Sequence, residues 1–292
     1  HARLSFQILG GLLLGLAVAL KVTPAFLGLV LLGRRRFISI GAMGAGLLLG
    51  LLLPASSAGW EGNWVYLRQW YTLIVESFQE IVFIRAWMNN QSIAGAIGKL
   101  FVPGSDVAQS RFGLPLFLPF TAGMSLVDLP GFYARVVSLI NLLLYGLGLS
   151  AALSVAWRGF RSYGLRPEAE CSSFAGVFAS MAAPDTQRLL LLATMIGLLA
   201  AGVSWYHAYS VLFLPLVFRM YGYLSDRFPF RRFDYFFLGV LALFGLLHGL
   251  LPELVREALA IYSVFTWLCL VLVVRWVYGI VRGESYEVAG NA

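Results

Sequence analysis

A series of long apolar runs, separated by short polar segments, constrains the fold of this chain more than any other feature. Several runs approach the ~20 consecutive apolar residues that an α-helix needs to span a bilayer. The mean hydropathy is +0.81, and 12% of the residues are charged. A soluble domain of 292 residues would need far more polar surface. The sequence therefore predicts an all-α, polytopic transmembrane protein.

The apolar runs predict about eight membrane segments in a single membrane domain that covers residues 1–292. The expected helices are 6–20, 25–32, 37–53, 133–157, 187–203, 207–224, 233–251 and 259–281. The second is too short to span ~30 Å as a straight helix, and it follows Lys21-Val22-Thr23-Pro24. Pro24 can end one helix and open the next. Broken membrane helices are tolerated where they line a protein-enclosed cavity, so we expect Lys21 to point into a cavity near the outer half of the bilayer.

The formal net charge of +7 reflects arginines that lie between the apolar runs. Three short polar clusters hold nine of them: Arg34, Arg35 and Arg36; Arg158, Arg161 and Arg166; Arg227, Arg231 and Arg232. Cytoplasmic loops of membrane proteins are enriched in this way, so the basicity predicts topology and no nucleic-acid partner. With the clusters inside, helix 37–53 runs outward and helix 133–157 runs back. The turn at Trp205-Tyr206-His207 then lies on the outer face.

Residues 55–132 differ in character from the apolar runs. They carry tryptophans and tyrosines interspersed with charged residues, including Trp60, Glu61, Trp64 and Arg68. Aromatic and charged residues at helical spacing are typical of amphipathic helices in the membrane interface. Five acidic and four basic residues make the region nearly neutral, in contrast to the arginine clusters. We therefore expect an external interfacial loop that contains one or two amphipathic helices.

Asn90, Gln91 and Ser92 form a polar cluster within this loop, just before a run of small residues. Their amides and hydroxyl supply donors and acceptors that suit sugar hydroxyls or a phosphate oxygen. Alternatively, Asn or Ser caps the N-terminus of a helix that starts here. The local sequence favours the cap about two to one, and both interpretations stay open.

Lys21 and His207 are the other two candidate groups. Lys21 could neutralise a phosphate at the membrane surface, or it could be a lysine at a helix end whose ammonium group reaches the interface. His207 could bind a phosphate, carry a proton or orient another group. Ionisable residues at membrane depth are costly, which raises a functional question. The alternative for His207 is an interfacial histidine beside the belt residue Trp205.

Other sites are not evident in the sequence. There is no Ser-His-Asp arrangement, metal-spaced His/Cys set, P-loop or GxGxxG fingerprint, so we predict no metal ion and no cofactor. The two cysteines, Cys171 and Cys269, are placed in ways that predict neither a disulfide nor a metal site. Asp185 follows Pro184 and is expected to start the helix that contains Gln187.

The order of these motifs resembles glycosyltransferase family 87. The shared pattern is a Lys-x-x-Pro break at Lys21 after a Gly/Leu-rich helix, an arginine-rich turn, an external Asn-Gln-Ser, and Ser-Trp-x-His between late helices. The resemblance extends over about residues 6–224. It implies a GT-C fold and an inverting hexosyltransferase. The expected activity transfers a hexose, often mannose, from a polyprenyl-phosphate sugar to a lipid or glycan acceptor at the external membrane face.

The resemblance also implies roles for the candidate residues. Lys21 would lie near the donor phosphate, and Asn90, Gln91 and Ser92 would border the donor or acceptor pocket. Trp205 and His207 would line the catalytic cavity, with His207 as a partner of the phosphate. The protein would be multi-pass in the plasma membrane, which is the inner membrane in a bacterium.

Two features depart from the family pattern. The catalytic Asp is expected in a first external loop, which would precede His1, and Ala208 stands where family members often carry a second His. We therefore expect the chain to be the C-terminal part of a longer protein, and to be inactive on its own. A transporter or lipid flippase with Lys21 and His207 along its path is the alternative function. A non-catalytic assembly scaffold is a third.

Overall fold

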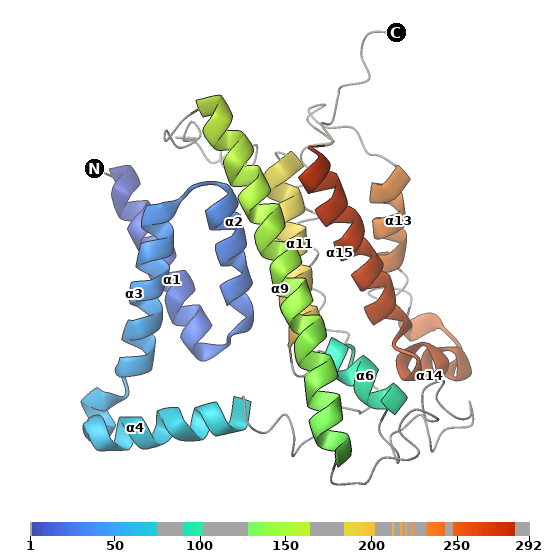
Figure 1. Ribbon diagram of the computed structural model, residues 1–292, viewed down its shortest axis with the longest axis horizontal. Helices are drawn as coiled ribbons and strands as arrows, with labels where there is room; N and C mark the ends of the chain where they lie inside the picture. The colour runs from blue at the N-terminus through green and yellow to red at the C-terminus, as the bar shows by residue number, and fades with distance from the viewer. Residues whose placement is uncertain are drawn as a thin grey trace.

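The computed structural model is helical in every regular element that it describes (Figure 1). The structure describes residues 2–74, 90–101, 128–163, 184–201, 232–242 and 248–283, together with the single positions Leu212, Val217, Met220 and Leu224. The predicted all-α class is therefore confirmed for these residues. The predicted helix 207–224 lies outside them apart from the single positions.

The chain begins with two antiparallel helical arms that are joined by a break. Helix α1 covers Ala2–Leu20, a 3-10 helix η1 covers Thr23–Leu27, and α2 covers Gly28–Gly33. Pro24 stands at the start of η1, where its missing N–H costs no helical hydrogen bond. The predicted break after Lys21 and the short second segment are thus confirmed.

Helix α3 (Phe37–Leu52) packs mainly against α1, and Figure 1 shows the two side by side. Glycines bring the two backbones close together. A Cβ atom on Gly15 would lie 2.6 Å from Leu47 N, and one on Gly46 would lie 2.9 Å from Leu12 C. Small residues allow this close approach of helices, as in the GxxxG pattern of membrane proteins.

Helix α4 (Ala55–Ile74) leaves α3 at a bend of 87° and lies across the end of the bundle (Figure 1). Its aromatic side chains are exposed, including Trp60 at 71% and Trp64 at 68%. The predicted helix with aromatic residues at helical spacing is confirmed. Its position in an external membrane interface stays a prediction.

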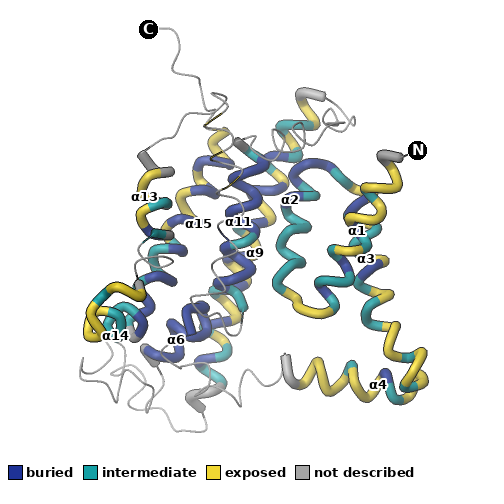
Figure 2. Tube along the Cα trace, turned by 180° about the vertical axis from the view of Figure 1, so that it is seen from behind, coloured by how far each residue is buried: buried dark blue, intermediate teal, exposed yellow. Residues whose placement is uncertain are grey.

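The centre of the molecule is built from α9 (Asp128–Tyr163), α11 (Pro184–Ala200) and α15 (Val264–Arg282). Nearly all of α11 is buried, as Figure 2 shows by its dark colour. Asp185 lies in the first turn of α11, as predicted. There a carboxylate is stabilised by the N-terminal end of the helix dipole.

The C-terminal part differs from the prediction. Helix 233–251 was expected, whereas the structure has α13 (Arg232–Leu241) and a separate 3-10 turn η5 (His248–Leu250). The expected single helix 259–281 is wrong at its start, because α14 (Glu253–Ile261) ends there. Ser263 has a φ of 50°, which is a left-handed conformation that no α-helix continues through. The chain therefore turns between α14 and α15.

The turn between α2 and α3, which carries Arg34 and Arg35, and the C-terminal end of α9, which carries Arg158 and Arg161, lie at the same end of the bundle (Figure 1). Arg34 Nη1 donates to Thr186 Oγ1 at 2.6 Å. Arg158 donates to Ile280 O at 2.6 Å and forms an ion pair with Asp185 at 3.0 Å. Arg34 and Arg158, from two of the predicted clusters, thus meet at the first turn of α11. The cytoplasmic location of this end stays a prediction.

By length and composition, two described helices could cross a membrane: Gly131–Arg161 within α9, and α15. The bent pair of α3 and α4 gives a third if it forms one span, and α1 is a shorter apolar helix. The predicted number of about eight membrane segments stays a prediction.

Candidate functional site

The candidate site is a buried polar cluster at the N-terminus of α6 (Ile93–Phe101). Asn90, Gln91 and Ser92 are fully buried. Asn90 Oδ1 accepts a hydrogen bond from Ser92 N at 3.1 Å, and Ser92 Oγ accepts one from Gly95 N at 3.0 Å. Ser92 therefore caps α6, in the way that serine satisfies the free amides of a first helical turn.

Gly95 is required because Asn90, just before α6, lies against the first turn of α6. A Cβ atom at Gly95 would lie 2.5 Å from Asn90 O and 2.6 Å from Asn90 Cγ. The loop before α6 therefore folds back onto its first turn. Any residue larger than glycine at position 95 would overlap Asn90.

Lys99 joins the cluster from the last turn of α6, and its side chain is fully buried. Its Nζ donates to Ala260 O at 2.7 Å and to Asn90 O at 3.0 Å. A buried ammonium group is costly unless it is hydrogen-bonded, and carbonyl oxygens supply that here. Lys99 thereby ties both ends of α6 to the end of α14.

Gln91 and Thr266 connect the cluster to the turn between α14 and α15. Gln91 Nε2 donates to Ala260 O at 3.1 Å, and Thr266 Oγ1 donates to Gln91 O at 2.8 Å. On the other side, Tyr133 of α9 donates from its hydroxyl to Ala94 O at 2.7 Å. The position of α6 is thus set by three elements that are distant in sequence.

The structure brings Asn90, Gln91 and Ser92 together, as their adjacency predicts, and adds Lys99 and Thr266, which the sequence analysis missed. One signal was available: Lys99 is one of only two lysines among 21 basic residues. Its carbonyl partners carry no sequence signal, because every residue has a backbone carbonyl. In chemical terms the cluster offers amide, hydroxyl and ammonium donors.

Lys21 lies elsewhere, at the C-terminal end of α1, where its backbone N donates to Ala17 O at 2.9 Å. Its side chain is exposed, whereas the α6 cluster is buried. The η1 turn that follows Lys21 packs on α11 beside Gly197, and α6 also contacts α11. The break and the cluster therefore lie toward the same end of the bundle, opposite the turn between α2 and α3 (Figure 1).

Trp205 and His207 lie outside the described residues. Within the described part of the chain, no group of three or more His, Cys, Asp or Glu side chains could hold a metal ion. Cys269 is a buried, free cysteine in α15.

The helical fold and its apolar spans define a membrane protein. The sequence profile of glycosyltransferase family 87 matches residues 2–184, which is more than half of the chain. The chain belongs to glycosyltransferase family 87. Its activity is accordingly that of a membrane glycosyltransferase, which uses a sugar donor and an acceptor. No curated protein and no solved structure matches the chain with statistical significance.

Some of the candidate residues lie inside the region that matches the family, and others lie beyond it. Lys21, Asn90, Gln91 and Ser92 lie inside the matched region. Trp205 and His207 lie beyond it, as do the carbonyl of Ala260 and the hydroxyl of Thr266 that hold α6.

Proposed function

We propose that the protein transfers a hexose, mannose in the first instance, from a polyprenyl-phosphate donor to a lipid or glycan acceptor at the external membrane face. One observation supports the external location of the site, which family membership does not show. The α6 cluster lies at the end of the bundle opposite the α2–α3 turn with Arg34 and the C-terminal end of α9 with Arg158. Arginine-rich turns mark the cytoplasmic side under the positive-inside rule, so the cluster belongs to the external side. We further propose a multi-pass protein of the plasma membrane.

The candidate residues differ in exposure, and the proposal gives them different roles for that reason. Lys21 is exposed beside a helix break, so in this proposal it meets the donor phosphate. The leaving group is an anionic lipid phosphate, and a cation at its point of departure stabilises the transition state. In this proposal, Trp205 and His207 line the catalytic cavity, with His207 as a second partner of the phosphate.

Asn90, Gln91 and Ser92 have a different role in this proposal. Their side chains are buried and hydrogen-bonded to α6 itself or to the α14–α15 turn. They would therefore form the wall of the donor or acceptor pocket and fix its shape. Lys99 would hold this wall against α14 through its two carbonyl contacts.

Sugar transfer from polyprenyl-phosphate mannose tests the proposal, with Lys21→Met placed in the membrane-embedded protein together with the upstream external loop that the sequence analysis expects. Loss of one charge-assisted contact costs about 1.5–3 kcal/mol, so we expect kcat/KM to fall about 10–100-fold. Lys21→Arg keeps the charge and should retain most activity. Arg68→Met, which removes an exposed cation from α4, is the matched control.

Two results would count against the proposal. Wild-type rates in Lys21→Met would remove Lys21 from the phosphate site. Transfer from a nucleotide sugar, with none from any polyprenyl-phosphate sugar, would refute the donor class while leaving the family intact.

A further inference from the structure

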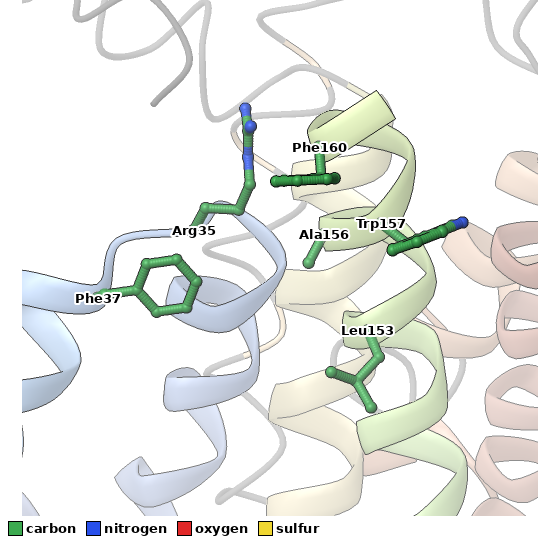
Figure 3. Close-up of a pocket in the computed structure, with 6 residues that line it drawn as sticks. All are labelled: Arg35, Phe37, Leu153, Ala156, Trp157 and Phe160. Carbon is green, nitrogen blue, oxygen red and sulfur yellow. The ribbon is translucent and has the colours of Figure 1, made fainter. Parts of the chain in front are cut away.

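A groove of about 470 Å³ lies at the arginine end of the bundle, on the side of the molecule away from the α6 cluster. The turn between α2 and α3 forms one wall, and the last turns of α9 form the other (Figure 3). Six residues line it: Arg35, Phe37, Leu153, Ala156, Trp157 and Phe160. None of the six is acidic, and four carry large apolar side chains.

The apolar part of the groove is long and open. Leu153, Trp157 and Phe160 follow one side of α9, and each is at least 42% exposed. The rings of Trp157 and Phe160 are stacked with centroids 6.0 Å apart. Phe160 follows Leu153 by seven positions along the helix, which corresponds to a rise of roughly 10 Å. A surface of this length and composition fits a segment of an acyl chain.

Positive charge lies in the wall of the groove, at Arg35, and just beside the groove, at Arg161. Arg161 is exposed in the last turn of α9, with its guanidinium 5.2 Å from the centre of the Trp157 ring. Arg35 forms part of the wall and packs over Gly159, where a Cβ atom would lie 3.1 Å from Arg35 Nε. Figure 3 shows Arg35 beside Phe160, with Leu153 further along α9. Positive charge therefore adjoins the apolar surface at the Phe160 end of the groove, and Leu153 lies toward the other end.

We propose that this groove binds an anionic phospholipid of the surrounding leaflet. Arg161 contacts the phosphate, Arg35 adds positive potential from the wall, and one acyl chain lies along Trp157 and Leu153. Guanidinium groups are well suited to phosphate oxygens. Basic pockets between membrane helices on the cytoplasmic side are typical lipid headgroup sites. Charge complementarity thus selects an anionic lipid over a zwitterionic one, and the site is separate from sugar transfer.

Native mass spectrometry of the purified protein tests this site, with phosphatidylglycerol and phosphatidylcholine offered at equal concentration. We expect the wild type to retain phosphatidylglycerol preferentially. Arg161→Gln should lower that retention about fivefold, as expected for one arginine near an anionic surface. Ala156→Trp keeps both charges but fills the groove, and it should give a comparable loss. Arg68→Gln on α4 is the control and should bind like the wild type.

Loss of lipid binding can be distinguished from misfolding even if one variant folds poorly. Thermal melting of each variant in detergent identifies misfolding, and the variant that melts like the wild type decides the result. Equal retention of the two lipids by the wild type would overturn the proposal. So would wild-type retention of phosphatidylglycerol in a folded Arg161→Gln or Ala156→Trp protein. Displacement of the lipid by inorganic phosphate alone would show that the apolar groove adds nothing.

Discussion

The contact between α1 and α3 permits a sharp test, because two glycines of α1 differ only in what faces them. A Cβ atom at Gly15 would lie 2.6 Å from Leu47 N and closer still to Met43 O. Both are backbone atoms, so no side-chain rotation relieves the overlap. At Gly10, on the exposed side of α1, nothing lies within 4 Å of the same atom. An alanine at Gly15 must therefore push the helices apart by on the order of an ångström, given ordinary contact distances near 3.5–4 Å.

The expected loss of stability follows from comparing alanine substitutions at the two glycines. Both Gly15→Ala and Gly10→Ala gain up to about 1 kcal/mol of helix propensity. That gain cancels in the difference between them. Overpacking costs typically about 1–3 kcal/mol, so Gly15→Ala should be less stable than Gly10→Ala by that amount. Gly10→Ala itself should be neutral or slightly stabilising.

The assay is unfolding in mixed detergent micelles, followed by the helical circular dichroism signal for each variant. A third variant adds a check, because Gly46→Ala separates the same pair of helices against Leu12. The double variant Gly15→Ala/Gly46→Ala should cost less than the sum of the two single changes, since the helices have already moved. Equal stability of Gly15→Ala and Gly10→Ala would refute the close backbone packing.

Three further substitutions probe the polar contacts. Lys99→Met removes a buried ammonium from two backbone carbonyls and should destabilise the protein by about 3 kcal/mol, whereas Lys21→Met, at an exposed position, should change the free energy of unfolding little. Ser92→Ala removes the cap of α6 and should cost about 1 kcal/mol. Thr186→Val breaks a buried hydrogen bond to an arginine of the α2–α3 turn and should cost about 2 kcal/mol. Thr194→Val, where the hydroxyl only bonds within α11, is its control, and equal unfolding midpoints of the two would contradict the prediction.

The N-terminal half of the fold was predictable because its physical signals are local. Apolar runs interrupted by arginines gave the positions of α1, α3 and α9, and Pro24 gave the break between α1 and α2. Asp185 marked the start of α11 through the preference of carboxylates for helix N-termini. In each case, the residues that determine the element lie within it or directly beside it.

The C-terminal part was harder because its turn has no local marker of the usual kind. Glycine or asparagine most often takes a left-handed conformation, whereas here Ser263 adopts it inside an apolar run. The sequence from residue 259 onward therefore predicted one continuous helix. The charged residues Glu253, Arg256 and Glu257 were the available sign of a separate, amphipathic α14.

The candidate site was predictable in its composition but not in its contacts. Asn90, Gln91 and Ser92 stand out as polar residues, and Ser92 fulfils the capping alternative. Their partners include the carbonyl of Ala260 in α14 and Thr266 in the first turn of α15, which only the tertiary fold brings near. No spacing pattern in a single sequence encodes such contacts.

The long-range hydrogen bonds of α6 have a consequence for how the protein is made. Lys99 is separated from Ala260 by 161 residues, and Gln91 from Thr266 by 175. At translation rates of about 5–20 residues per second, the ribosome needs roughly 8–30 s to add the first of these partners. During that interval α6 lacks the Ala260 carbonyl of α14, so Asn90 O is the one acceptor of Lys99 already made, and water, lipid headgroups or the insertion machinery must supply the rest. Helices α14 and α15 therefore complete the burial of a segment that was synthesised much earlier.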